Sequence, residues 1–223
     1  MTGAARWIYH GPMRAVLWTA AAWTLWCTLH SGLIARPVTD WLRMRLGARF
    51  GYYRLLYNAL SAASLLPLAA LHWWLMGPLL LRYRGAWILL ALVLNAVAAL
   101  LFVLGAKAYG MADFLGLRSA RAAWRGESAE EEAPFASAGV LRWVRHPWYL
   151  AGILVLWGHD LDAPGLAAAI VLTLYLLLGA WLEERKLVTL HGDAYRAYQE
   201  AVPMFIPRRP MGRNDRRWMR NEE

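Results

Sequence analysis

The chain has 223 residues, of which 59% are hydrophobic and only 17% are charged. An ordinary soluble domain carries roughly 25% charged residues, and this balance excludes a disordered chain, a coiled coil and a disulfide-stapled miniprotein. The formal net charge is +9 and comes mainly from arginine. Such an excess of positive charge is typical of proteins that bind nucleic acid, of proteins that contact anionic lipid, and of the cytoplasmic loops of membrane proteins. The distribution of the charge along the chain distinguishes these explanations.

Five apolar stretches without Asp, Glu, Lys or Arg follow one another along the chain. They cover residues 15–35, 55–81, 85–106, 146–159 and 163–182. A membrane-spanning helix needs about 20 apolar residues, because the hydrocarbon core is about 30 Å thick and each residue rises about 1.5 Å. All but the 14-residue stretch 146–159 meet that length. None has a polar face of helical period, so we expect an all-α polytopic membrane protein with five transmembrane helices.

The basic residues are sorted between alternate connections. Twenty lie after the first stretch, after the third stretch and in the C-terminal part, against four on the other side. The positive-inside rule therefore places the N-terminus outside and the C-terminus in the cytoplasm, in a bacterial-type inner membrane and in contact with membrane lipids. No nucleic-acid-binding motif accompanies the basic tail, so we expect no nucleic-acid partner, and we predict no protein partner.

Glycine and proline mark several predicted boundaries. Residues 37–46 have apolar residues at helical spacing, which predicts a short interfacial helix that Gly47 ends. Pro164 suits the start of the fifth helix, and Gly192 suits the residue after its end. We expect one domain, residues 1–223. Its predicted helices lie at about 15–35, 55–81, 85–106, 146–159 and 164–191, followed by a cytoplasmic tail, 192–223, that is mobile over 208–223.

Two groups of polar residues border the last two helices on the expected cytoplasmic side. Arg145, His146 and Pro147 begin the short fourth stretch, which cannot cross the whole core. An Arg and a His at that depth favour a polar cavity, although a snorkelling Arg beside a helix-starting Pro is the alternative. Glu183 and Glu184 lie where the fifth helix leaves the bilayer, and taken alone they fit a solvated helix face.

The tail adds aromatic residues on the same side. Tyr195 and Tyr198 are one helical turn apart behind Asp193, which can cap their helix, and taken alone they fit an amphipathic segment on the membrane. All three features together predict a hairpin of the fourth and fifth helices over a cytoplasm-facing cofactor pocket. Arginine can bind a carboxylate and aromatic rings can stack on a base or face a cation, which suits a zwitterionic cofactor with a flat base.

Metal chemistry has little support in the sequence. The single cysteine, Cys27, has no thiolate cluster around it, so we expect no metal site. Haem is an alternative, since His30 with His146, or His72 with His159, could ligate iron from one side of the membrane.

At these residues the sequence resembles the integral-membrane methyltransferases related to isoprenylcysteine carboxyl methyltransferase. That superfamily has an Arg-His-Pro-x-Tyr element, followed one helical hairpin later by a Glu-Glu element and a Tyr-x-x-Tyr tail. The matching stretches here are RHPWY at 145–149, LEERKL at 182–187 and HGDAYRAYQEAVPMFIP at 191–207. A closer likeness is to the bacterial methanethiol S-methyltransferases, through LHSGLIARP at 29–37, DFLGLR at 113–118 and VPMFIP at 202–207.

The resemblance implies an S-adenosylmethionine-dependent methyltransferase. Its acceptor is a thiol, either small, such as methanethiol, or lipophilic, with a lipophilic carboxyl acceptor also open. The implied cofactor side consists of His146, Pro147, Tyr149, Glu183, Glu184, Tyr195 and Tyr198. The implied acceptor side consists of His30, Arg36, Asp113 and Arg118. The implied catalytic residues are Arg145, which favours a thiolate, and His146 or His30, either of which can take the proton.

Two other functions compete with methyl transfer. An NADPH-dependent membrane reductase of the sterol or enone type shares a similar His-Pro-x-Tyr pattern, but the Glu-Glu-Arg-Lys element and the VPMFIP ending fit the methyltransferases better. A non-enzymatic transporter or assembly factor predicts that His146→Ala and Glu184→Ala leave function intact.

Overall fold

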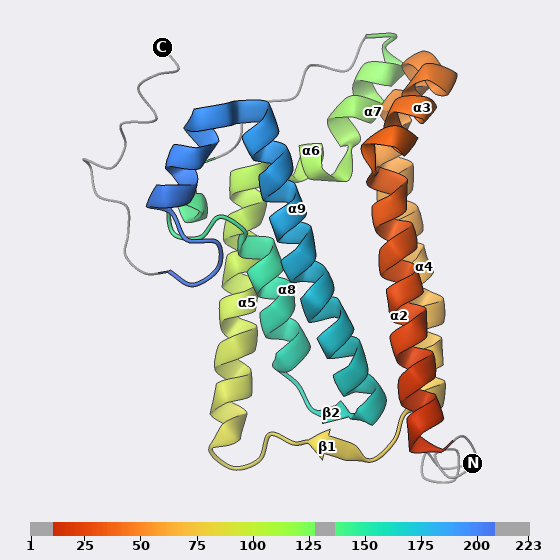
Figure 1. The fold of residues 1–223 in the computed structure, drawn as a ribbon, viewed down its shortest axis with the longest axis vertical. Helices are drawn as coiled ribbons and strands as arrows, with labels where there is room; N and C mark the ends of the chain where they lie inside the picture. The colour runs from red at the N-terminus through yellow and green to blue at the C-terminus, as the bar shows by residue number, and fades with distance from the viewer. Residues whose placement is uncertain (1–10, 128–136, 208–223) are drawn as a thin grey trace. The chain divides into compact units, whose positions relative to one another are not determined.

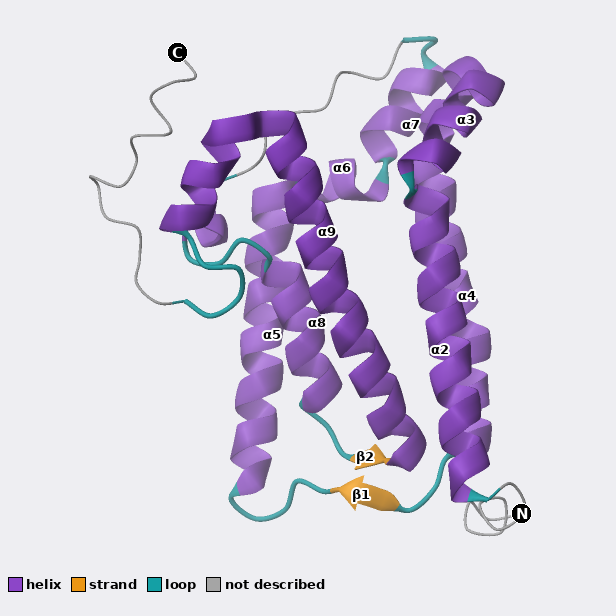
Figure 2. Cartoon of the chain, viewed as in Figure 1, coloured by secondary structure: helices purple, strands orange, loops and turns teal. Residues whose placement is uncertain are grey.

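A computed structural model describes residues 11–127 and 137–207, and this part of the chain is helical apart from two short strands (Figures 1 and 2). The segment 208–223, predicted to be mobile, lies outside the described residues. The chain divides into two compact units. Among the described residues, the first unit comprises 11–84, 111–127 and 159–172, and the second comprises 85–110, 137–158 and 173–207. The single domain expected over 1–223 stays a prediction.

In the first unit, two long helices pack along each other and short helices cover one end. These helices are α2 (Pro12–Ile34), α3 (Arg36–Leu46), the 3-10 helix η1 (Gly47–Tyr52), α4 (Tyr53–Leu75), α6 (Met111–Leu115) and α7 (Leu117–Trp124). Helix α2 packs on α4, and α7 packs on η1 and α4. The contact with η1 requires Gly51, because a Cβ there would lie 2.6 Å from the Cβ of Ala123.

The short helix predicted at residues 37–46 is confirmed as α3. Pro37 occupies its first turn, where a missing N–H breaks no helical hydrogen bond. Gly47 ends it with a φ of 52°, in the left-handed region that favours glycine. No residue of α3 is buried within the described residues, and its position at the membrane surface stays a prediction.

Helix α4 is shorter than the predicted 55–81, because Pro78 favours extended backbone before it and the chain leaves the helix at Met76. The apolar run continues as strand β1 (Leu79–Leu81), which pairs antiparallel with β2 (Leu161–Asp162). The buried carboxylate of Asp162 accepts the backbone N–H groups of Gly77 and Gly165, each at 2.7 Å. These bonds tie the end of the α4 segment to the first turn of the last helix.

The described part of the second unit contains three helices and a 3-10 turn. They are α5 (Trp87–Tyr109), η2 (Gly139–Arg142), α8 (Pro147–Trp157) and the part of α9 (Ala163–Ala201) from residue 173 onward. Helix α8 packs along α5, where the indole N–H of Trp148 donates to the carbonyl of Phe102 at 3.0 Å. On its other side the indole N–H of Trp157 donates to the hydroxyl of Thr173 in α9 at 3.0 Å.

Helix α9 contains a sharp break at Gly192, which has a φ of 55°. This agrees with the prediction that the helix ends at Gly192, and the chain then forms further helical turns up to Ala201. Figure 1 shows this last part, in blue, turning back from the long helix. Tyr195, Tyr198 and Val202 form a buried cluster on the returning segment, which places the tail aromatics next to the residues before α8.

Three helical stretches of the described chain are long and apolar enough to cross a membrane: Arg36–Leu75, Trp87–Tyr109 and Ala163–Ala201. Helix α8 is also apolar but has only 11 residues. Large apolar side chains on these helices are exposed, for example Leu89 at 66% and Leu174 at 62%. Apolar surface of this extent indicates contact with lipid. The predicted all-α fold is confirmed, and its three long apolar helices are consistent with the predicted polytopic membrane protein.

Candidate active site

The short segment before α8 is held by the C-terminal tail. The backbone N–H of Arg145 donates to the carbonyl of Pro203 at 3.1 Å, and the backbone N–H of His146 donates to the carbonyl of Met204 at 3.3 Å. Pro147 then starts the helix, leaving His146 as the flanking residue with non-helical backbone angles. The predicted Arg-His-Pro element is therefore fixed on its backbone side by the tail.

The guanidinium of Arg145 binds groups from α9 and from the residue that follows it. Its Nε donates to Oε1 of Glu184 at 2.6 Å, and both side chains are only 8% exposed. Its Nη1 donates to the carbonyls of Gln199, at 2.8 Å, and of Val202. A buried charge needs both a partner and further hydrogen bonds, and Arg145 has both.

The imidazole of His146 lies between two carboxylates. Its Nε2 is 3.2 Å from Oε1 of Glu184, and its Nδ1 is 3.8 Å from Oε2 of Glu183. The amide of Gln199 donates to the other oxygen of Glu184 at 2.8 Å. Both carboxylate oxygens of Glu184 are therefore bound by side chains of the protein itself. The Glu183 side chain, in contrast, is 42% exposed.

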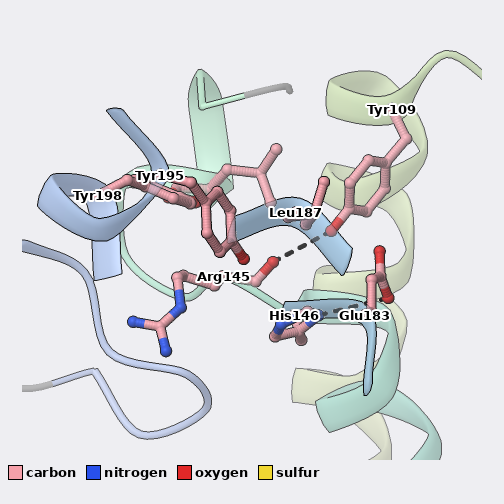
Figure 3. Close-up of a pocket in the computed structure, with 8 residues that line it drawn as sticks. Tyr109, Arg145, His146, Glu183, Leu187, Tyr195 and Tyr198 are labelled. Atoms are coloured by element: carbon pink, nitrogen blue, oxygen red, sulfur yellow. Dashed lines mark hydrogen bonds and ion pairs between the residues drawn. The ribbon is translucent and has the colours of Figure 1, made fainter. Parts of the chain in front are cut away.

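A pocket of about 190 Å³ opens beside His146 (Figure 3). It is lined by Tyr109, Leu141, Arg145, His146, Glu183, Leu187, Tyr195 and Tyr198. The phenol of Tyr198 donates to the carbonyl of Leu141 at 2.6 Å, and the phenol of Tyr109 donates to the carbonyl of Arg145 at 3.2 Å. Sites that enclose a drug-sized ligand measure about 300–1,000 Å³, so this hollow matches part of a nucleoside cofactor.

The side chains that line the pocket fit a cofactor that carries both positively and negatively charged groups. Glu183 offers a carboxylate, and the faces of Tyr109, Tyr195 and Tyr198 can attract a cation or stack on a flat base. No group of three or more His, Cys, Asp or Glu side chains within residues 11–127 and 137–207 is arranged to hold a metal ion.

The structure brings together most of the residues predicted for the cofactor side. His146, Glu183, Tyr195 and Tyr198 line the pocket together with Arg145. The remaining three predicted residues lie next to the pocket but do not line it. Glu184 lies behind His146, Pro147 is buried in the first turn of α8, and the ring of Tyr149 packs edge-on against His146 at 5.3 Å. Their contacts with a cofactor stay predictions.

The residues predicted for the acceptor side lie in the first unit. The ring of His30 is held between α2 and α4, with Nδ1 3.1 Å from the hydroxyl of Ser61 and Nε2 2.7 Å from that of Tyr57. Asp113 and Arg118 form an exposed ion pair of 3.2 Å, and Arg36 is the first residue of α3. Their roles toward an acceptor also stay predictions.

Two polar groups at the site were not predicted from the sequence. Gln199 binds Glu184, and Tyr109 lines the pocket from the last turn of α5. Gln199 directly follows Tyr198 in the predicted tail helix, so it could have been identified by its proximity to that residue. Nothing in the sequence around Tyr109 distinguishes it from an aromatic residue at a membrane interface.

An all-α fold with long apolar helices and a buried Arg-His-Glu cluster beside an aromatic pocket defines a membrane-embedded enzyme. A methanethiol S-methyltransferase of Pseudomonas sp. strain GM41 is 32% identical over 203 residues, which are 87% of this chain and 74% of the relative. The enzyme of the same name from Pseudomonas deceptionensis is 30% identical over 86% of this chain and 73% of its own. That of Mycobacterium tuberculosis is 38% identical over 43% of this chain and 39% of its own.

The chain belongs to the methanethiol S-methyltransferase family. This membership confirms the predicted class, an S-adenosylmethionine-dependent methyltransferase that acts on a thiol, and decides against the reductase and the non-enzymatic alternatives. No family model matches the chain. No solved structure matches it either.

Proposed function

We propose that this chain transfers a methyl group from S-adenosylmethionine to a small thiol such as methanethiol, at the cytoplasmic face of a bacterial-type inner membrane. The observation that carries the proposal is the pocket in the second unit, where Glu183 and three tyrosines surround a hollow next to His146. A carboxylate and aromatic faces suit the ammonium and sulfonium charges and the adenine ring of this cofactor. When bound, the cofactor supplies an electrophilic methyl group.

The contribution of the protein is alignment and exclusion of water. Rates of methyl transfer depend on holding nucleophile and methyl carbon in line, which a rigid pocket achieves at low entropic cost. Arg145 and Glu184 fix the segment before α8, and the tail carbonyls of Pro203 and Met204 hold its backbone. Burial of His146, whose side chain is 3% exposed, keeps this part of the site dry.

For the acceptor side we propose two different kinds of role. His30 links α2 to α4 through Tyr57 and Ser61, which supports a structural role within the membrane. Arg36 and the pair Asp113–Arg118 are exposed polar groups, and for them we propose contact with the methyl acceptor, as the resemblance implies. We also propose that the chain belongs to the wider superfamily of isoprenylcysteine carboxyl methyltransferase.

For the membrane topology we propose five spans, formed by α2, α4, α5, α8 and α9, with the N-terminus outside. Support comes from the sorting of the basic residues, twenty against four. Helix α3 then lies on the cytoplasmic surface with its arginines toward lipid headgroups. Arg43 over Phe50 and Arg45 over Trp41, at 5.0 and 5.7 Å, are arrangements suited to that interface.

Calorimetry on the purified protein in detergent tests the cofactor. We expect S-adenosylhomocysteine to bind and NADPH not to bind, and the reverse would overturn the proposal. Glu183→Gln should weaken this binding by about tenfold or more, because a hydrogen bond to a charged group contributes roughly 1.5–3 kcal/mol. Glu200→Gln, at an exposed position on the same tail, should not weaken it. Label from S-adenosylmethionine should appear in dimethyl sulfide when methanethiol is supplied.

A further inference from the structure

The hydrogen bonds around Glu184 determine which nitrogen of His146 carries a proton. An ionised carboxylate only accepts hydrogen bonds, and the adjacent Arg145 guanidinium keeps this one ionised. Oε1 of Glu184 lies 3.2 Å from Nε2 of His146, so that nitrogen must be the donor. Gln199 occupies the second oxygen and so holds the carboxylate in this orientation.

The other ring nitrogen is left on the pocket side. When the imidazole is neutral it has one N–H, and Nδ1 of His146 then carries the lone pair. It points toward Glu183, which lines the pocket, across 3.8 Å (Figure 3). This separation is longer than the roughly 2.7–3.2 Å of an N–H···O hydrogen bond. Glu183 therefore lies within ion-pair distance of Nδ1 but makes no direct hydrogen bond to it, which leaves room for a ligand to bind Nδ1.

His30, the other candidate base, has a different environment. Both of its ring nitrogens lie within 3.1 Å of hydroxyl groups, from Ser61 and Tyr57 of the neighbouring helix. Its ring also stacks on Trp26 at 4.6 Å. These contacts hold His30 as a link between two helices, which favours His146 as the base.

We propose that Nδ1 of His146 accepts the proton of the thiol acceptor, and that Glu184 is a positioning residue that holds His146 in the Nε2–H tautomer. The proposal rests on the proposed function. The S–H bond breaks, its electron pair stays on sulfur to give the nucleophilic thiolate, and a new N–H bond forms at Nδ1. The resulting imidazolium lies between Glu183 and Glu184, which stabilise its charge. It returns the proton to water after the product leaves.

Nitrogen-15 NMR of the histidine-labelled wild-type protein tests the tautomer without any substitution. We expect the His146 signals, assigned by their loss in His146→Gln, to show a neutral ring with the proton on Nε2. A proton on Nδ1, or a ring protonated on both nitrogens at neutral pH, would overturn the proposal. This readout does not depend on the identity of the acceptor.

Comparison of a thiol with a selenol tests the proton transfer itself. A selenol is already ionised at neutral pH and needs no base, whereas methanethiol is mostly protonated. General-base catalysis contributes about 10²–10⁴-fold, so His146→Gln should lower kcat with methanethiol at least about 100-fold and kcat with methaneselenol far less. Equal losses on both acceptors would show a structural role for His146 and would overturn the proposal.

Glu184→Gln extends the test to the positioning residue. Without the carboxylate, His146 is free to change tautomer, so the loss with methanethiol should again exceed the loss with methaneselenol. Glu200→Gln, which removes an exposed carboxylate from the same segment, is the matched control. Binding of S-adenosylhomocysteine is measured in parallel. A wild-type protein that does not bind it overturns the proposed function, whereas normal binding with equal losses on both acceptors overturns only the role of Glu184.

Discussion

Arg145 and Glu184 form an ion pair of 2.6 Å in which each side chain is only 8% exposed. It joins the segment before α8 to α9, and through the carbonyls of Gln199 and Val202 it also joins the returning tail. Taking two charges out of water is costly, and the geometry of the pair must compensate for that cost. One interaction therefore supports both sides of the pocket.

Removing one partner of this pair should destabilise the protein strongly. Arg145→Leu leaves Glu184 charged and buried, and such a change costs about 3–5 kcal/mol. We expect a much lower melting temperature for the detergent-solubilised protein. Arg142→Leu, which removes an exposed arginine three residues earlier, is the control and should melt close to wild type. Similar melting of the two variants would show that the pair contributes little.

His30 should act mainly on the stability of the first unit. His30→Leu removes its hydrogen bonds to Tyr57 and Ser61 between α2 and α4. Side-chain hydrogen bonds between membrane helices average about 0.6 kcal/mol and reach about 1.7 kcal/mol, so we expect a loss of about 1–2 kcal/mol in thermal unfolding. Thr28→Val is the control, because Thr28 bonds only within its own helix. Unchanged stability with a loss of thiol turnover would instead support an acceptor role.

Much of the fold and of the site could be predicted because short-range rules determine it. Gly47 and Gly192 end helices where their backbone takes a positive φ, and Pro147 starts α8. The Arg-His and Glu-Glu elements meet because α8 and α9 are adjacent in sequence and pack together. Neighbouring helices with a short connection are the simplest case for prediction from the sequence.

Long-range details could not be predicted in the same way. The apolar run at Leu79–Leu81 forms a strand, and a short apolar run has the same pattern in a helix and in a strand. The sequence also does not distinguish Glu183, which lines the pocket, from Glu184, which is buried behind His146. Adjacent residues on a helix point about 100° apart, so only the packing of the tail shows which one faces the pocket.

The proposed topology can be tested with single cysteines in a Cys27→Ala background. Arg82→Cys lies in the connection between α4 and α5, and Arg142→Cys lies in η2 before α8. Both positions are exposed. In intact cells a membrane-impermeant maleimide should label the first and not the second, because the positive-inside rule places them on opposite sides. The opposite labelling pattern would show an inverted orientation, and labelling of both positions would contradict the proposal that α5, which lies between them, spans the membrane.

The packing of α8 on α5 depends on the absence of a side chain at Gly105. A Cβ at this position would lie 2.5 Å from the indole nitrogen of Trp148, which donates to the carbonyl of Phe102. Gly105→Ala should therefore displace the indole and cost about 1–3 kcal/mol, as overpacking does. Gly32→Ala, in helix α2, has open space around its Cβ and should be neutral or slightly stabilising, because alanine favours helix. Thermal unfolding of both variants measures the difference. Because Trp148 is two residues from His146, Gly105→Ala should also weaken binding of S-adenosylhomocysteine, and an unchanged affinity would show that α8 can shift without disturbing the pocket.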